Sequence, residues 1–238
     1  VRGPRLLRGV DAEMAAAVLD GMREQGIQVL LEQTVVAVEG DPKALTAQLG
    51  NGQSLDCGGV LMATGRRPWL ADLGLDAAGV AVDNGRITVD ANSCTSVPHI
   101  HAVGDVTDRV NLTPVAIDEG RAFADGVFGS RQRQVNHDLV ASAVFSDPEL
   151  ATVGLSEEQA IERHGEDGVV VHRARFRSMA RALPASGPRC LLKLVVEKHT
   201  DRVLGCHMVG EHAAEIIQMA AIAAVSYTHL RAHETCGH

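Results

Sequence analysis

The first part of the chain changes from a helical to an extended hydrophobic pattern. Apolar residues recur every three or four positions after Asp11, a residue type that caps helices, and Gly26 follows the last of them. This spacing predicts one helix whose apolar face consists of Met14, Val18, Leu19 and Met22. Short apolar runs then predict strands over residues 27–31, 34–38, 45–49 and 61–64. Turn residues separate several of these runs, so we expect a helix that leads into a strand and then a small antiparallel meander.

The middle of the chain predicts a short buried strand that ends in Gly104 and Asp105, a loop, and a helix that begins at Thr113 and Pro114. We expect the Thr113 side chain to cap this helix. In open α/β sheets, ligands bind just outside the carboxyl ends of strands. Gly104 has no side chain, so a cofactor can approach the backbone there, and Asp105 offers a carboxylate to a sugar hydroxyl. The helix start would direct free N–H groups and a partial positive charge at an electron-rich ring. The segment therefore favours a bound flavin, although Asp105 taken alone is equally typical of a turn at a strand end.

After residue 136 the pattern is typical of an α+β domain. Two strands separated by a turn precede a helix that Ser156 caps, with Glu158 and Gln159 close behind. Alternating apolar positions predict further strands in the segments VVVHRARF, CLLKLVVEK and VLGCHMVG. The Ala-rich segment EHAAEIIQMAAIAAV predicts a long helix. We expect three strands with two helices on one side.

Several of these segments resemble one family. HAVGD followed by NLTPVAIDEGRAFA resembles the second flavin-binding stretch of the pyridine nucleotide-disulfide oxidoreductases, and FRSMARAL is similar to members that reduce glutathione disulfide. The matching motifs occur in the family's order from residue 1 to about residue 225, which is more specific than an isolated glycine pattern. The resemblance implies FAD and NADPH as cofactors and the reduction of glutathione disulfide as the reaction.

The resemblance also implies a domain order. Residues 1–66, which end in ATGRRP, would form the C-terminal half of an NADPH-binding domain, and residues 67–135 the C-terminal part of an FAD-binding domain. Residues 136–225 would form the dimerisation domain, through which two copies pair. The expected fold class is therefore α/β and α+β, with partial Rossmann-like NADPH and FAD domains followed by an α+β interface domain. Residues 226–238 do not fit the family pattern, and we interpret them as a non-native tail.

Four residues are candidates for binding the pyridine nucleotide. Arg2 and Arg8 lie on the loop that follows a Rossmann strand, where arginine accommodates the 2′-phosphate of NADPH and an acidic residue would instead bind NAD. The resemblance implies that both hold this phosphate; the alternative is a solvated basic loop. Gly65 permits close approach of the dinucleotide, and Arg66 resembles an arginine that lies near NADPH in the family.

Three further residues receive a role from the resemblance. Asn111 and Ala143 match positions near the nicotinamide, Ala143 through its backbone alone. Arg121 lies about two turns into the helix that follows the loop. Either it meets a glycine carboxylate of glutathione disulfide, or it is a surface arginine that pairs with Asp118 or Asp125.

Composition limits the partners and the location. The 238 residues carry a net charge of −8, which argues against nucleic acid or an anionic membrane as a partner. No apolar run approaches the roughly 20 residues of a membrane span. The 5 cysteines are scattered, which suits reduced thiols in a cytoplasmic protein. His229 and His233 have a spacing that zinc sites use, but they lie at a terminus and we expect no metal.

Other motifs of the family do not occur in the sequence. It contains no C-x4-C pair, no G-x-G-x-x-G segment for either dinucleotide, and no His-Pro segment of the catalytic His–Glu pair. We therefore expect no catalytic residue in the chain. Because Val1 is not methionine and the sequence starts within a motif, we expect a fragment that is inactive alone.

Other assignments stay open at this point. Dihydrolipoamide dehydrogenase shares the fold but prefers NAD, and Arg2 and Arg8 speak against it. Trypanothione reductase and mercuric reductase would use NADPH with another substrate. A non-catalytic dimerisation module is the alternative from a different class of function.

Overall fold

A computed structural model describes residues 1–41, 44–184, 187 and 189–226. They form two compact units, the first of Val1–Leu61 with Ala141–His238 and the second of Met62–Val140. We call them the large unit and the small unit and describe each by itself. Both contain helices and short strands, which confirms the expected mixture of α/β and α+β structure. Among the described residues, no helix is both long enough and apolar enough to cross a bilayer.

The large unit begins with helix α1 (Ala12–Glu24), as the hydrophobic spacing predicts. The side chain of Asp11 caps it by accepting the backbone N–H groups of Glu13 and Met14. An antiparallel meander follows, with β1 (Val35–Asp41), β2 (Ala44–Leu49) and β3 (Ser54–Cys57) in that order. The strands predicted over residues 27–31 and 61–64 are wrong. A strand requires a ladder of backbone hydrogen bonds with a neighbour. Among the described residues neither segment belongs to such a ladder, although the Val1 amino group donates to the backbone oxygen of Leu30 at 2.9 Å.

The second part of the large unit is a five-stranded antiparallel sheet in the order β6-β7-β10-β9-β8. It therefore joins all five strands that the sequence predicts after residue 136, not three of them. The bounds of its strands are Ser142–Val144 for β6, Leu150–Gly154 for β7, Val169–Phe176 for β8, Cys190–Glu197 for β9 and Arg202–Val209 for β10. Between them lie α4 (Glu157–His164), with the expected capping box at Ser156, the 3-10 turn η2 (Glu166–Gly168) and the short helix α5 (Met179–Ala182).

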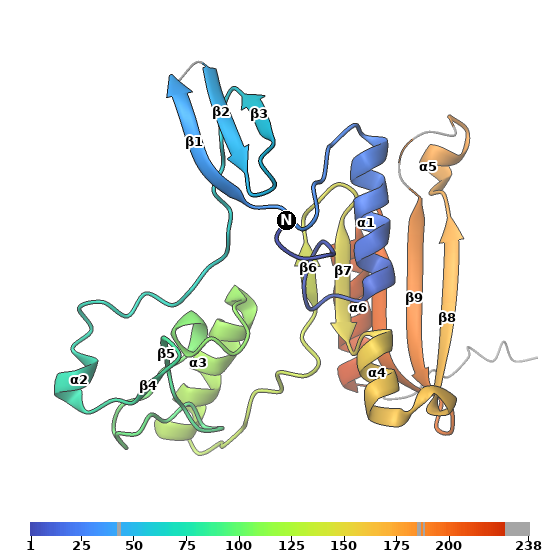
Figure 1. Ribbon diagram of the computed structural model, residues 1–238. Coiled ribbons are helices and arrows are strands. Elements are labelled where there is room, and N and C mark those ends of the chain that lie inside the picture. The colour runs from blue at the N-terminus through green and yellow to red at the C-terminus, as the bar shows by residue number, and fades with distance from the viewer. Residues whose placement is uncertain (42–43, 185–186, 188, 227–238) are drawn as a thin grey trace, which may run out of the picture. The chain divides into compact units, whose positions relative to one another are not determined.

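Helices cover both faces of this sheet, so the prediction of two helices on one side is wrong (Figure 1). Successive residues of a strand point to opposite faces, and the core residues divide accordingly. Met208 of β10 packs with Ile217 of α6 (Ala213–Ser226), whereas the adjacent Val209 packs with Met14 and Val18 of α1. Helix α4 packs through Ala160 against the face that α1 also covers.

A buried lysine joins α1 to the sheet. The side chain of Lys193 on β9 is only 1% exposed. Its Nζ lies 2.8 Å from both carboxylate oxygens of Asp11, 2.6 Å from a carboxylate oxygen of Glu157 and 3.2 Å from one of Glu13. Burial alone would lower the pKa of Lys193, but the hydrogen bonds to Asp11 and Glu157 outweigh this effect and the pKa is raised. The lysine is therefore held in its charged form.

Two arginines of β8 complete the charge balance of this cluster. Arg173 donates to both Glu13 and Glu157, and Arg175 donates to Glu13 at 2.9 Å. The hydrogen bonds from Arg173, Arg175 and Lys193 outweigh the effect of burial and lower the pKa of Glu13 to about 2. Three cations thus face three carboxylates, and the cluster connects α1, α4, β8 and β9.

Helix α1 also makes a close backbone approach to the segment between β6 and β7. A Cβ atom added to Gly21 would lie 2.4 Å from the ring of Pro148, so only glycine fits there. Beside it, the Gln25 side chain donates to the backbone oxygen of Asp147. Residues at the start of the chain are therefore an integral part of the large unit.

The small unit has little regular structure before its main helix. It contains α2 (Leu75–Ala78), a hairpin of β4 (Val82–Asp83) and β5 (Arg86–Ile87), the 3-10 turn η1 (Gly104–Thr107) and α3 (Thr113–Val127). Val80, Ile87 and Ala102 form its core. The strand predicted before Gly104 is wrong, because the segment makes one isolated bridge, Cys94 to His101, and no ladder among the described residues. Its backbone is nevertheless extended at Val103.

We expect replacement of Lys193 by methionine to lower the free energy of unfolding by about 3–5 kcal/mol, because it leaves three carboxylates without their central cation. Urea unfolding of the chain measures the change. The matched control is Lys198→Met, since Lys198 lies at the end of the same hairpin and is exposed. The control should stay within about 0.5 kcal/mol of the wild type. Equal effects of the two substitutions would contradict this account of the cluster.

Candidate functional site

The predicted Gly-Asp motif forms a tight turn, the Gly104 turn, which comprises residues 104–107. Gly104 is buried and has a φ of +74°, a conformation that favours glycine. A Cβ atom added there would lie 3.0 Å from the Cβ atom of Ala116 in the first turns of α3. The Thr107 hydroxyl donates to the backbone oxygen of Gly104 at 2.8 Å and closes the turn. The turn therefore packs directly against the start of α3, and Asp105 follows on its exposed side.

Helix α3 begins with Thr113 as its first helical residue, while Leu112 is the cap residue. The expected cap by the Thr113 side chain is therefore wrong. Proline lies within the first two helical positions, as predicted, and among the described residues no side chain caps this end of the helix. The first N–H groups of a helix lack partners within it and carry a partial positive charge. This end of α3 can thus donate to an electron-rich ligand.

Two more predicted residues lie in the small unit near this turn. The guanidinium of Arg66 lies 3.9 Å from the carboxylate of Asp105, and their side chains are 79% and 48% exposed. So exposed a pair contributes little to stability, and the arginine can be displaced from the carboxylate at small cost. Gly65 beside it has a φ of +129°, which only glycine adopts readily.

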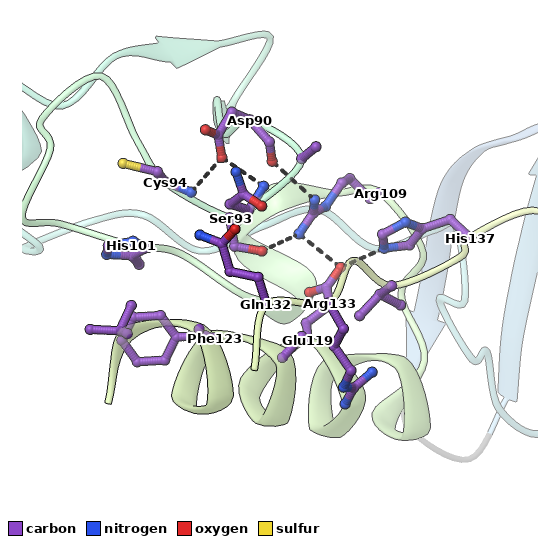
Figure 2. A pocket seen from close by; sticks show the side chains of 16 residues that line it. Asp90, Ser93, Cys94, His101, Arg109, Glu119, Phe123, Gln132, Arg133 and His137 are labelled. Carbon is purple, nitrogen blue, oxygen red and sulfur yellow. Dashed lines mark hydrogen bonds and ion pairs between the residues drawn. The ribbon is translucent and has the colours of Figure 1, made fainter. Parts of the chain in front are cut away.

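Glu119 lies behind the Gly104 turn and was missed by the sequence analysis. Its side chain on α3 is 2% exposed. One carboxylate oxygen accepts the Gly104 N–H at 2.6 Å. The other lies 2.9 Å from Arg109 and 2.7 Å from Nε2 of His137 (Figure 2). The spacing along the helix could have indicated its role. Glu119 follows Val115 by one helical turn and so lies on the buried face, where an acidic residue needs partners.

A cavity of about 240 Å³ lies on the Arg109 and His137 side of Glu119 (Figure 2). The rings of His101 and Phe123, whose centroids are 4.8 Å apart, line part of it. Asp105 and Thr113 do not line this cavity. We therefore place the candidate site at the exposed side of the Gly104 turn, because that is where the unpartnered donors and the accessible carboxylate occur.

The structure places the other two predicted residues of this unit on its surface. Arg121 is exposed on α3, and Asp118 and Asp125 pair with Arg133 instead, at 2.7 Å and 3.7 Å. The pairing suggested as the alternative for Arg121 is therefore absent among the described residues. The Asn111 side chain donates to Asp108 at 2.6 Å.

The remaining predicted residues lie in the large unit. Arg2 and Arg8 are exposed on the loop that precedes α1, without an ion-pair partner among the described residues. Ala143 lies in the middle of β6 and is half-buried.

Four of the cysteines lie in the described part of the chain. Cys57, Cys94, Cys190 and Cys206 are free thiols. Burial raises the pKa of the Cys206 thiol to about 11, which keeps it protonated and supports a structural role. No metal-ligand cluster occurs among the described residues, and the His229–His233 pair lies outside them.

Comparison with known proteins identifies both parts of the chain. The pyridine nucleotide-disulphide oxidoreductase family matches residues 1–120, and its dimerisation domain matches residues 140–232. A glutathione reductase of Nostoc sp. is 46% identical over 235 residues, which cover 93% of this chain and 51% of that protein. A glutathione reductase of Burkholderia cepacia is 48% identical over 223 residues, which cover 93% and 49%. The chain thus spans about half the length of these relatives.

Two further similarities are more distant. A trypanothione reductase of Trypanosoma congolense is 37% identical over 226 residues, which cover 93% of this chain and 45% of that protein. Among solved structures, the HOCl-induced flavoprotein disulfide reductase RclA from Escherichia coli matches with a TM-score of 0.85 and 26% identity, over 99% of this chain and 56% of that one.

The two family matches together cover most of the chain. The Gly104 turn and the uncapped start of α3 agree with the family that they identify. The family's description names a pyridine nucleotide, and the similar solved structure is that of a flavoprotein disulfide reductase. This chain belongs to the pyridine nucleotide-disulphide oxidoreductase family.

Proposed function

We propose that this chain works in an NADPH-dependent, FAD-containing reductase of glutathione disulfide. The observation that carries the proposal is the Gly104 turn, which packs against the uncapped first turn of α3 and carries the accessible carboxylate of Asp105. The choice of glutathione disulfide is supported by the two glutathione reductases at 46% and 48% identity. The trypanothione reductase at 37% supports a second candidate, a related disulfide with a larger substituent.

The flavin would meet the small unit at Gly104, Asp105 and Thr113. Gly104 allows close approach, the Asp105 carboxylate accepts a hydrogen bond from a sugar hydroxyl, and the amides at the start of α3 face electron-rich atoms. Bound FAD would supply two-electron transfer from a nicotinamide to a disulfide. We assign Asn111, and Ala143 through its backbone, to the surroundings of the nicotinamide.

The 2′-phosphate of NADPH would meet Arg2 and Arg8. Both guanidinium groups are exposed on one loop, where their forked donors suit a phosphate. We also assign Gly65 and Arg66 to the binding of NADPH. Arg66 would then leave its exposed, 3.9 Å contact with Asp105.

These roles correspond to the domain order expected from the sequence. We assign residues 1–66 to the C-terminal half of the NADPH-binding domain, 67–135 to the C-terminal part of the FAD-binding domain and 136–225 to a truncated dimerisation domain. Residues 226–238 we keep as a non-native tail; the family match reaches residue 232, and residues 227–238 lie outside the described part. We also propose a cytoplasmic location, from the scattered cysteines.

The proposal assigns no catalytic residue to this chain. Its cysteines are residues 57, 94, 190, 206 and 236, so no two are spaced as C-x4-C. Arg121, exposed and without a carboxylate partner among the described residues, is the proposed contact for a glycine carboxylate of glutathione disulfide. We expect this chain by itself not to reduce the disulfide.

The partner of the dimerisation domain would be a second copy of the chain. Helix α6 is apolar on both sides: Ile217 is buried in the sheet core, while Ile216, Met219 and Ile222 are 37%, 63% and 61% exposed. Exposed apolar residues gathered on one side of a helix normally mark an interaction surface, so the outer side of α6 requires a cover. The match to the family's dimerisation domain supports a homodimer.

Flavin binding tests the role of Asp105. We expect Asp105→Asn to weaken FAD binding about tenfold, because it removes one charge-assisted hydrogen bond. Quenching of FAD fluorescence during titration with the chain measures the affinity. Asp76→Asn is the matched control, since Asp76 is an exposed aspartate on α2 of the same unit. A wild-type chain that does not bind FAD, or equal losses in both variants, would contradict the proposal.

Discrimination between NADPH and NADH tests the arginine loop. We expect Arg2→Met with Arg8→Met to weaken NADPH binding by about tenfold or more and to leave NADH binding unchanged, because only NADPH carries the 2′-phosphate. Isothermal titration calorimetry with each nucleotide measures both affinities. Arg5→Met, in the same exposed loop, serves as the control. The assignment is wrong if the double variant loses affinity for NADH to the same extent.

The oligomeric state tests the outer side of α6. We expect Ile222→Glu to shift the chain from dimer to monomer, because a buried unpaired carboxylate costs several kcal/mol at an interface. Sedimentation velocity measures the distribution. Ile117→Glu, at an exposed isoleucine on α3, is the control and should leave the dimer intact. A wild-type chain that sediments as a monomer would refute the homodimer.

A further inference from the structure

One carboxylate in the small unit connects four segments of chain. Glu119 accepts the N–H of Gly104 through one oxygen and bonds Arg109 and His137 through the other. Arg109 in turn donates to the Ser93 hydroxyl at 2.9 Å and to the backbone oxygen of Asp90 at 3.5 Å. Figure 2 shows these side chains pointing toward one another from α3, from the loop before it, from the segment after it and from residues 90–94.

The bond to Gly104 controls the geometry of the turn. Gly104 is buried and stands at the start of η1, so its N–H has no partner within that 3-10 turn. The carboxylate of Glu119 accepts it at 2.6 Å, the distance of a charge-assisted bond. A buried N–H group without an acceptor would destabilise this conformation. The direction in which Asp105 leaves the turn therefore depends on a residue 15 positions further along the chain.

Arg109 and His137 keep the Glu119 carboxylate in place. Its 2% exposure means that water cannot solvate it, so it needs protein donors on both oxygens. His137 lies 2.7 Å away and is oriented to donate from Nε2. With both partners present, the second oxygen is satisfied and the first remains available to Gly104.

We propose that Glu119 is the positioning residue of the flavin site: it fixes the Gly104 turn so that Asp105 is presented to FAD. This role rests on the function proposed above, and it assigns Glu119 no contact with the cofactor. Arg109 and His137 are positioning residues too, because they hold the Glu119 carboxylate in place and do not contact the cofactor. A residue with a merely structural role would change the stability of the whole unit, whereas a positioning residue changes the Gly104 amide and FAD affinity together.

Two substitutions of Glu119 distinguish its bond to Gly104 from its bonds to Arg109 and His137. Glu119→Gln retains one oxygen, which can still accept the Gly104 N–H, but its NH₂ group cannot accept from Arg109 or His137. Glu119→Leu removes every acceptor at similar volume. Asp118→Asn is the matched control, because Asp118 is the preceding residue on α3, pairs with Arg133 and has no bond to Gly104.

The experiment measures the Gly104 amide in the full chain without cofactor, by hydrogen exchange observed with NMR, and then FAD affinity by fluorescence titration. We expect Glu119→Leu to speed exchange at Gly104 and to weaken FAD binding, each by about tenfold or more. Glu119→Gln should show smaller changes in the same direction, and Asp118→Asn should match the wild type. Circular dichroism identifies any variant that does not fold, in which case Glu119→Gln carries the test.

The outcomes separate this proposal from the function on which it rests. Unchanged exchange at Gly104 in Glu119→Gln and Glu119→Leu would overturn the positioning role, even if the wild type binds FAD. Exchange that accelerates equally at the β4–β5 hairpin would overturn it too, because the effect would then be general destabilisation. Failure of the wild type to bind FAD would overturn the proposed function and the flavin role of Glu119, whereas the exchange rates would still decide whether Glu119 fixes the turn.

Discussion

Each unit of this protein encloses a charged side chain that water hardly reaches, and the surrounding residues must neutralise it. Lys193 is 1% exposed in the large unit, and Glu119 is 2% exposed in the small unit. An ion buried without partners costs several kcal/mol, so the native arrangement requires the opposite charges to converge on it. Around Lys193 this brings α1 onto the sheet, and around Glu119 it brings the Gly104 turn onto α3.

Both charges lie close in sequence to the residues proposed to bind cofactors. Asp11, which pairs with Lys193, follows the exposed loop of Arg2 and Arg8 and also caps α1. Gly104, which Glu119 holds, immediately precedes Asp105. The bonds of the two buried charges therefore also anchor the segments from which the proposed ligand contacts extend. A buried polar network stabilises a fold to the extent that its members are satisfied. The Lys193 ammonium and both oxygens of Glu119 have partners, whereas Nε of Arg109 has none among the described residues.

The sequence predicts those structural features that depend on residues close together in the chain, such as a helix and its cap. Helix α1 with its Asp11 cap and the capping box at Ser156 follow from local spacing, and both are confirmed. Strand pairing depends on distant segments, so apolar runs at 27–31 and 61–64 gave strands that do not form, and helices on both faces of the sheet were not foreseen. Glu119 was missed for the same reason: its place one turn after Val115 indicates burial, but its partners Gly104, Arg109 and His137 all lie outside its own helix.

The central claim is that the Gly104 turn and the start of α3 form the surface that receives FAD. Hydrogen–deuterium exchange of the wild-type chain, mapped by mass spectrometry with and without saturating FAD, tests it most directly. The account predicts that FAD slows exchange at residues 104–107 and in the first turn of α3, and leaves the β1–β2–β3 meander unchanged. Protection confined to other segments, with none at the turn, would contradict it.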